Sequence, residues 1–279
     1  MKEQLRLEVM QLKEQGGKTP HLAAVLVGNN PASESYVGSK VKTCSELGYE
    51  STLLRFETSI TEETLLDEIR KLNMNDQVDG ILVQLPLPGH ISENAVINAI
   101  DPSKDVDGFH PISQGKMLLG QPGFLPATPY GILLMLEHYG IDVTGKHCVV
   151  IGRSNIVGTP MTILLSRNTN PGNATVTMCH SKTKNLRELT LQADVIVAAI
   201  GRAKFVTADM VKDGAIIIDV GINRIEDAEK KSGYRLVGDV DFEGVAPKSS
   251  YITPVPKGVG PMTICGLMKN TLLAARLKK

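Results

Sequence analysis

The most informative segment of this chain is His147-Cys-Val-Val-Ile-Gly-Arg-Ser-Asn-Ile-Val-Gly-Thr-Pro160. An apolar run stops at Gly152, and a polar turn then leads toward a helix expected to start near Thr159. This order is typical of a βα turn that binds a dinucleotide, because the helix N-terminal amides receive the pyrophosphate. The turn departs from Gly-x-Gly-x-x-Gly, since Ser154 replaces the second glycine and Gly158 comes one residue late. Arg153 adds a cation where a phosphate would arrive.

Short apolar runs alternate with helical patterns along the whole chain. Strands are expected at residues 23–27, 52–56, 80–85, 147–151, 174–179, 195–200, 215–220 and 236–240. Helices are expected at residues 32–47, 62–74, 130–139 and 263–277. Strand–helix–strand alternation predicts an α/β fold with parallel sheets and right-handed crossovers.

Two stretches rich in proline and glycine, residues 120–129 and 251–261, divide the chain. They predict a first domain at residues 1–128 that is completed by a C-terminal helix at 262–279. Residues 129–261 are expected to form a second, Rossmann-like domain, because they contain the dinucleotide turn.

Composition excludes several classes of protein. The 279 residues carry 30 basic and 30 acidic side chains, a balance that argues against a nucleic-acid-binding surface. The longest apolar runs have strand length, and the first residues begin a mixed-charge amphipathic helix, so we expect no membrane segment and a cytoplasmic protein. The cysteines are far apart and the histidines show no metal-ligand spacing, which predicts free core thiols and no metal site.

The end of the second strand of a dinucleotide fold selects between NAD and NADP. NAD enzymes place an acidic residue there for the ribose 2′-hydroxyl. This chain has no acid there but His180-Ser-Lys-Thr183, which together with Arg153 suits a 2′-phosphate; the alternative is a solvated loop. NADP is therefore favoured over NAD. Ile222, after the glycine that closes a later strand, could contact the nicotinamide half through its main chain or simply form a turn.

The first half carries a second group of polar residues. Tyr36 and Lys40 are four apart and share a helix face, where partial burial would lower the lysine pKa as a general base requires. The alternative is a solvated helix face. Gln84 ends a buried strand, where its neutral amide could bond a ligand or the lysine without adding charge. Asp107 could accept paired N–H donors from an amino-substituted heterocycle; the alternative is an Asx-type turn.

Six motifs in order make the chain similar to a known family. They are Ser35-Tyr-Val-x-x-Lys40, Val83-Gln-Leu-Pro86, Lys104-Asp-Val-Asp-Gly108, Gly152-Arg-Ser154, His180-Ser-Lys-Thr183 and Thr253-Pro-Val-Pro-x-Gly-Val-Gly-Pro-Met-Thr263. From about residue 23 to its end, the chain resembles the bifunctional methylenetetrahydrofolate dehydrogenase/methenyltetrahydrofolate cyclohydrolase family.

The resemblance implies two α/β domains flanking a cleft, and usually a homodimer joined through the cofactor domain. It implies that Lys40 is the catalytic lysine, with Tyr36 beside it and Gln84 hydrogen-bonded nearby. It further implies that Asp107 holds the pterin ring of the folate and that a loop from Pro256 to Gly260 lines the folate site. The residues implied to bind NADP are Gly152, Arg153, Ser154, Ser181 and Ile222.

The implied reactions run in sequence at one site. Hydride leaves the methylene carbon of 5,10-methylenetetrahydrofolate for NADP⁺, and water then attacks the methenyl cation to give 10-formyltetrahydrofolate. Two alternatives are a related enzyme with dehydrogenase activity only and a non-catalytic NADP-binding regulator on the same fold. The first would be expected to lack part of the lysine set, and the second would leave Tyr36, Lys40 and Gln84 without a purpose.

The chain departs from the family pattern in two places. Lys257 occupies a position where the family usually has a glycine, so it could touch the folate glutamate tail or face solvent. The short strand and the Ile-Asp-Gly-type turn that the family commonly has before its first helix are not seen.

Overall fold

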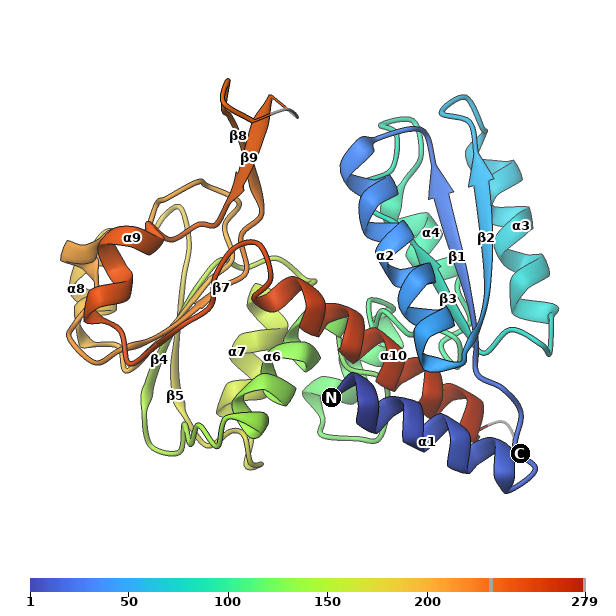
Figure 1. The fold of residues 1–279 in the computed structure, drawn as a ribbon, viewed down its shortest axis with the longest axis horizontal. Coiled ribbons are helices and arrows are strands. Elements are labelled where there is room, and N and C mark those ends of the chain that lie inside the picture. The colour runs from blue at the N-terminus through green and yellow to red at the C-terminus, as the bar shows by residue number, and fades with distance from the viewer. Residues whose placement is uncertain (231–232, 278–279) are drawn as a thin grey trace. The chain divides into compact units, whose positions relative to one another are not determined.

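The computed structural model describes residues 1–230 and 233–277. They form two compact units, which are described separately (Figure 1). The first unit contains Met1–Ala127 and Ile264–Lys279, and the second contains Thr128–Thr263.

A three-stranded parallel sheet with strand order β2-β1-β3 forms the centre of the first unit (Figure 1). Its strands are β1 (His21–Val27), β2 (Glu50–Phe56) and β3 (Gly80–Val83). One face packs against α3 (Glu62–Met74) and α4 (Glu93–Ala99) in an aliphatic core. The other elements of the unit are α1 (Lys2–Glu14), α2 (Pro31–Leu47), α5 (Pro111–Leu118) and most of α10 (Val259–Leu277).

Local sequence signals explain where α2 begins and ends. The Asn30 side chain accepts hydrogen bonds from the backbone N–H groups of Ala32 and Ser33, and Pro31 occupies the first turn. The helix ends at Gly48, whose φ of +78° is the left-handed conformation that glycine adopts easily. Both ends of the helix that carries Tyr36 and Lys40 are therefore fixed.

A five-stranded parallel sheet with strand order β10-β7-β6-β4-β5 forms the centre of the second unit. The strands are β4 (His147–Ile151), β5 (Thr175–Cys179), β6 (Val195–Ala198), β7 (Ile216–Asp219) and β10 (Tyr251–Ile252). Aliphatic cores cover both faces, one with α6 (Ala127–His138) and α7 (Gly158–Ser166), the other with α8 (Leu186–Gln192) and α9 (Phe242–Val245). Two 3₁₀ turns, η1 (Ala208–Met210) and η2 (Ala246–Lys248), complete the unit with the β8–β9 ribbon. The predicted α/β class with parallel sheets is confirmed.

An inner strand of each sheet, β1 in the first and β4 in the second, ends in a glycine turn of similar construction. The N–H of Gly28, after β1, donates to Phe56 O at 2.8 Å, and the N–H of Gly152, after β4, donates to Cys179 O at 2.8 Å. Each glycine has a positive φ. In both units the turn after this inner strand is thus held beside the end of the next strand, at the carboxyl edge where α/β proteins bind ligands.

The expected strand at residues 236–240 is wrong. Residues Tyr234–Val237 form β9, which pairs antiparallel with β8 (Asn223–Glu226) in a separate two-stranded ribbon. The arginines of this ribbon face solvent while Ile225 and Leu236 are half-buried, so the segment lacks the double-sided burial of a parallel core strand. Val240 makes only an isolated bridge to Val206.

Within the described residues, no helix has the length and apolar composition that crossing a bilayer requires. The cysteines predicted to be free are unpaired and buried: Cys44, Cys148, Cys179 and Cys265.

Candidate active site and cofactor edge

Lys40 is a buried ammonium group at the centre of the candidate active site. It lies on α2 with 4% of its surface exposed. Its Nζ donates to Gln84 Oε1 at 3.1 Å and lies 4.7 Å from the centroid of the Tyr36 ring. The amide oxygen and the ring face both stabilise the cationic form without supplying a counter-charge. The structure therefore brings together Tyr36, Lys40 and Gln84, which the sequence placed on two separate elements.

Gln84 is oriented by its own main chain. It follows β3, and its backbone N–H continues the ladder by donating to Val25 O at 2.9 Å. Its side-chain Nε2 donates to Leu85 O at 2.7 Å, which turns the amide oxygen toward Lys40. A neutral acceptor in this orientation holds the lysine without fixing its protonation state.

Two opposing effects set the protonation of Lys40 and Asp107. Burial lowers the pKa of Lys40, and the negative charge of Asp107 opposes that change. Burial raises the pKa of Asp107 to about 6, and the positive charge of Lys40 opposes that change in turn. Each group thus stabilises the charged form of the other, and both titrate closer to neutrality than they would in water.

The loop that carries Asp107 is anchored by two neighbours that the sequence analysis did not assign. Lys104 Nζ donates to three main-chain oxygens at the end of α3, on Leu72 (2.9 Å), Asn73 (2.6 Å) and Asn75 (2.8 Å). This places a cation on the carbonyls that a helix C-terminus leaves unpaired. The burial of a lysine beside two aspartates was not visible in the sequence, where Lys104 has the appearance of a surface residue.

Asp105 closes the other end of this loop. Its carboxylate accepts from the backbone N–H of Phe109 at 3.1 Å and of His110 at 2.9 Å. Burial raises the pKa of Asp105 to about 6, against the lowering effect of a hydrogen bond with the Ser113 side chain and of these main-chain hydrogen bonds. Asp105 therefore stabilises the main chain of the loop through hydrogen bonds. Asp107, in contrast, is the carboxylate whose charge acts on Lys40.

The dinucleotide turn of the second unit depends on two glycines. Gly152 has a φ of +130°, and a Cβ there would lie 2.2 Å from Ala199 O. Gly158 begins α7, and a Cβ there would lie 2.3 Å from the oxygen of Gly152. Gly158 comes one residue later than the last glycine of Gly-x-Gly-x-x-Gly. It lets the first residues of α7 pack directly against the backbone of Gly152. These two positions exclude side chains and keep the backbone open to a phosphate.

Ser154 and Arg153 occupy the turn between those glycines. Ser154 Oγ accepts from the backbone N–H of Val157 at 3.2 Å and of Gly158 at 3.3 Å, so the hydroxyl helps to cap α7. Both Arg153 and Ser154 are exposed. An exposed cation beside a helix N-terminus fits a phosphate group.

The turn after β5 lies beside the dinucleotide turn, because Gly152 N–H donates to Cys179 O. In this turn the Thr183 hydroxyl accepts from the N–H of His180 at 3.0 Å, and His180 Nδ1 accepts from the N–H of Lys182 at 3.2 Å. These bonds leave Ser181 exposed at the tip. Arg153 and this turn follow the ends of two paired strands, β4 and β5, so they lie at the same edge of the sheet.

Two buried aspartates, which the sequence analysis missed, organise the ends of β6 and β7. The Asp239 carboxylate accepts from three successive backbone N–H groups, of Ile200 (2.7 Å), Gly201 (2.9 Å) and Arg202 (2.8 Å), and from Asn223 Nδ2 (2.9 Å). These bonds end the strand predicted at residues 195–200 two residues early, since Ile200 N–H turns to a side chain.

Asp219 supports the same region from β7. Its carboxylate accepts from the N–H groups of Gly221 (3.0 Å), Asp239 (2.9 Å) and Val240 (3.0 Å), and burial raises its pKa to about 6. Ile222 lies between Gly221 and Asn223, which these two aspartates hold, and is 58% exposed. The loop therefore presents the main chain around Ile222 at the carboxyl edge of the sheet.

The loop that precedes α10 belongs to the second unit, whereas Lys40 belongs to the first. Pro256 is exposed, and Gly260 is half-buried in the first turn of α10. Lys257 has a φ of +83°, a conformation that glycine adopts without strain. This backbone conformation suits the glycine that the family resemblance leads us to expect at this position.

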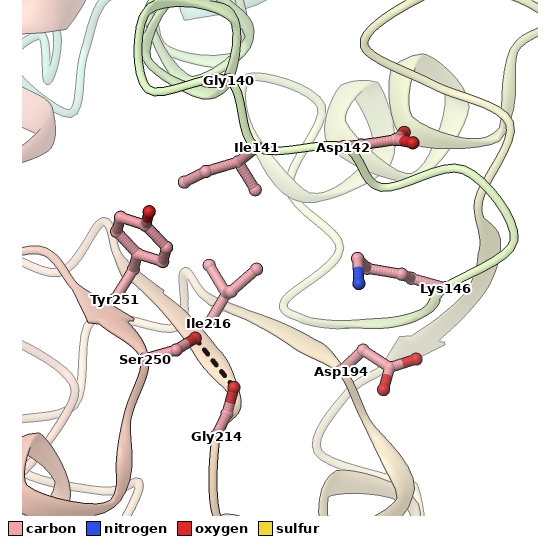
Figure 2. Close-up of a pocket in the computed structure, with 9 residues that line it drawn as sticks. All are labelled: Gly140, Ile141, Asp142, Lys146, Asp194, Gly214, Ile216, Ser250 and Tyr251. Atoms are coloured by element: carbon pink, nitrogen blue, oxygen red, sulfur yellow. Dashed lines mark hydrogen bonds between the residues drawn. The ribbon is translucent and has the colours of Figure 1, made fainter.

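The second unit also has an open pocket of about 400 Å³ (Figure 2). It is lined by Gly140, Ile141, Asp142, Lys146, Asp194, Gly214, Ile216, Ser250 and Tyr251. Several of these residues directly precede or begin strands β4, β6, β7 and β10, so the pocket lies at the amino edge of the parallel sheet. It is therefore at the opposite edge from Gly152 and separate from the cofactor turn. Among residues 1–230 and 233–277, no cluster of three or more histidine, cysteine or acidic side chains could hold a metal ion.

Two family models match this chain. The catalytic domain of tetrahydrofolate dehydrogenase/cyclohydrolase matches residues 1–107, and the NAD(P)-binding domain of the same family matches residues 126–279. The chain belongs to the tetrahydrofolate dehydrogenase/cyclohydrolase family. This confirms the predicted family, the bifunctional folate enzyme class and a nicotinamide-cofactor domain in the second half.

Known members of the tetrahydrofolate dehydrogenase/cyclohydrolase family are similar over the full chain. A bifunctional protein FolD from Cytophaga hutchinsonii is 62% identical over 278 residues, covering 100% of this chain and 96% of the relative. The crystal structure of the bifunctional FolD enzyme from Campylobacter jejuni is 51% identical with a TM-score of 0.92, covering 100% of this chain and 95% of that one. A dehydrogenase-cyclohydrolase from Trypanosoma brucei, solved with NADP and an inhibitor, is 35% identical with a TM-score of 0.93, covering 99% of this chain and 93% of that one. The roles of individual residues stay predictions.

Proposed function

We propose that this chain carries out both reactions of its family, with NADP⁺ as the oxidant and Lys40 as the base of the hydrolysis. It would oxidise 5,10-methylenetetrahydrofolate to 5,10-methenyltetrahydrofolate and hydrolyse that product to 10-formyltetrahydrofolate. The observation that carries the proposal is the buried Lys40 ammonium, held between Gln84 Oε1 and the Tyr36 ring in the charge field of Asp107.

The hydrolysis needs a group that takes a proton from water. Burial lowers the pKa of Lys40, so a larger fraction of the amine is neutral near pH 7 than for a solvated lysine. As water adds to the methenyl carbon, its oxygen forms the new C–O bond and a proton passes to Lys40 Nζ. Gln84 Oε1 and the Tyr36 ring can then stabilise the ammonium that forms. The hydroxyl of the adduct then loses its proton and forms the C=O bond as the C–N bond to N5 breaks. N5 takes up a proton, and the carbon remains on N10 as the formyl group.

The dehydrogenation depends mainly on how the two ligands are positioned, because the reacting carbon needs no obligatory base. NADP⁺, when bound, accepts the hydride. We assign the pterin ring to Asp107, whose carboxylate can accept two N–H donors of an aminopyrimidine when it is ionised. Pro256 and Gly260 are assigned to the folate site by the family resemblance.

NADP is preferred to NAD in this proposal because of the groups around the dinucleotide turn. Gly152 leaves room for the pyrophosphate, and exposed Ser154 and Arg153 offer a hydroxyl and a guanidinium beside α7. Ser181 lies exposed in the neighbouring turn, which carries no carboxylate to repel a 2′-phosphate. The backbone near Ile222 is assigned to the nicotinamide half.

We also propose a homodimer joined through the cofactor domain and a cytoplasmic location. The family resemblance supports the dimer. The four unpaired, buried cysteines support the location, because thiols persist in a reducing compartment.

Purified protein given 5,10-methylenetetrahydrofolate with NADP⁺ or NAD⁺ tests the proposal. We expect the absorbance of the methenyl compound to appear, faster with NADP⁺, and then to decay as the formyl product forms. Methenyl accumulation without decay would leave a dehydrogenase only. Absence of the methenyl signal with both cofactors would contradict an oxidoreductase and leave a non-catalytic NADP-binding protein.

A further inference from the structure

Asn270 is a buried amide in the C-terminal helix α10, within the first unit. Only 1% of its surface is exposed. Its Nδ2 donates two hydrogen bonds, to Val106 O at 2.8 Å and to Leu125 O at 2.7 Å. A polar side chain in this position destabilises a core unless its hydrogen bonds are made, so the two bonds are what allow an asparagine there.

The two acceptors of Asn270 belong to segments that lie against each other. Val106 directly precedes Asp107, and Leu125 lies two residues before Ala127, whose N–H donates to Asp107 O at 3.1 Å. A Cβ on Gly108 would lie 2.6 Å from the carbonyl carbon of Leu125, so there is no free space between the segments. Asn270 thus connects the segment of Val106 with the segment of Leu125, next to Asp107.

The same loop is joined to the sheet on its other side. The N–H of Ile81, in β3, donates to Lys104 O at 2.8 Å. The Val106 side chain fills the space where a Cβ of Gly80 would stand, only 2.6 Å from Val106 Cγ1. The main chain before Asp107 is therefore held by β3 on one side and by Asn270 on the other.

We propose that Asn270 is a positioning residue for folate binding, which fixes the main chain on both sides of Asp107 and so aims its carboxylate at the pterin. This inference rests on the proposed assignment of Asp107 to the pterin. Removing the amide leaves two buried carbonyls without their donor and lets the two segments separate. Small displacements of a positioning group are costly, so we expect the KM for methylenetetrahydrofolate to rise about tenfold or more.

Asn270→Ala is the direct test, with Thr271→Ala as a matched control. Thr271 is the next residue of α10, is fully buried, and donates its Oγ1 hydrogen to Leu267 O at 2.9 Å within its own helix. We expect both substitutions to lower the thermal midpoint, but only Asn270→Ala to raise the KM for methylenetetrahydrofolate. The KM for NADP⁺ should change in neither. Equal folate KM values in the two variants would reduce Asn270 to a structural role.

A double-mutant cycle with Asp107→Ala separates the inference from the proposed function. With the dissociation constant of tetrahydrofolate as the readout, adding Asn270→Ala to Asp107→Ala should cause no further loss. Additive losses would overturn the inference. If Asp107→Ala alone binds tetrahydrofolate as tightly as the parent, the assignment of Asp107 fails instead. If Asn270→Ala does not fold, Asn270→Ser, which keeps one short donor, replaces it in both comparisons with the same expected direction.

Discussion

At the scale of single residues, the surroundings of Lys40 determine how hydrolysis should depend on pH. The rate should rise with pH as the amine loses its proton. Because the charge of Asp107 raises the pKa of Lys40, Asp107→Asn should lower that pKa further and move the rise toward lower pH. Hydrolysis rates at saturating methenyltetrahydrofolate, from about pH 6 to about pH 9, measure this shift. Asp76→Asn, an exposed site in the same unit, is the control. A rise that stays in place, or moves to higher pH, would contradict the coupling.

Arg153 provides a second prediction at this scale. Arg153→Ala should raise the KM for NADP⁺ by about tenfold or more while changing the KM for NAD⁺ little, because a charge-assisted hydrogen bond to the 2′-phosphate is lost. Initial rates with each cofactor give the two values. Arg187→Ala, an exposed arginine paired with Asp209 in the same unit, should change neither. Equal losses for both cofactors would show that Arg153 does not recognise the 2′-phosphate.

Part of the candidate site could be predicted from the sequence because two of its residues are close together in one helix. Tyr36 and Lys40 share a helix face by periodicity alone, and the structure places the Nζ over the ring. The bond to Gln84 joins residues 44 positions apart, and no spacing rule predicts it. Lys104 and Asn270 were missed for the same reason, since their partners lie on other elements.

At the scale of elements, the Asp239 carboxylate joins the loops after β6 and β7. Asp239 accepts four N–H donors from these loops, which an asparagine can match only in part because its own N–H₂ would face donors. Asp239→Asn should therefore weaken NADP⁺ binding about tenfold or more and lower dehydrogenase activity. Hydrolysis of methenyltetrahydrofolate without cofactor should remain, because Lys40 lies in the other unit.

Asp241→Asn is the control for Asp239, since Asp241 is partly exposed and pairs with Lys204. Its dehydrogenase activity should be close to that of the parent. Loss of hydrolysis together with dehydrogenation in Asp239→Asn would indicate general unfolding and contradict a local role.

Elements were predictable where burial is regular along the chain. The segments expected at residues 62–74 and 147–151 are α3 and β4 as the structure has them, because one is amphipathic and the other fully apolar. The β8–β9 ribbon could not be predicted as such, since its pairing is antiparallel and half-exposed. Helices α4 and α5 were also missed, because they are only 7 and 8 residues long.

At the scale of the whole molecule, three buried carboxyls predict how stability depends on pH. Burial raises the pKa of Asp105, Asp107 and Asp219 to about 6, above the ordinary value of an unfolded chain. Their protonation favours the folded state, so stability is gained as pH falls through about 6 and lost as pH rises through it. The thermal midpoint should be higher at about pH 5 than at about pH 7. Asp219→Asn should reduce this difference, and a midpoint that falls over the same window would contradict the prediction.

The two units have separate roles in this proposal: hydrolysis is assigned to Lys40 in the first unit and NADP binding to residues of the second. Lys40→Met tests it most directly, with Lys42→Met, an exposed lysine two residues away on α2, as the control. The measurement is the rate of methenyltetrahydrofolate hydrolysis beside the dissociation constant of NADP⁺. We predict that Lys40→Met loses hydrolysis and keeps the NADP⁺ affinity of the parent, while Lys42→Met keeps both. Full hydrolysis in Lys40→Met would show that Lys40 is not the base.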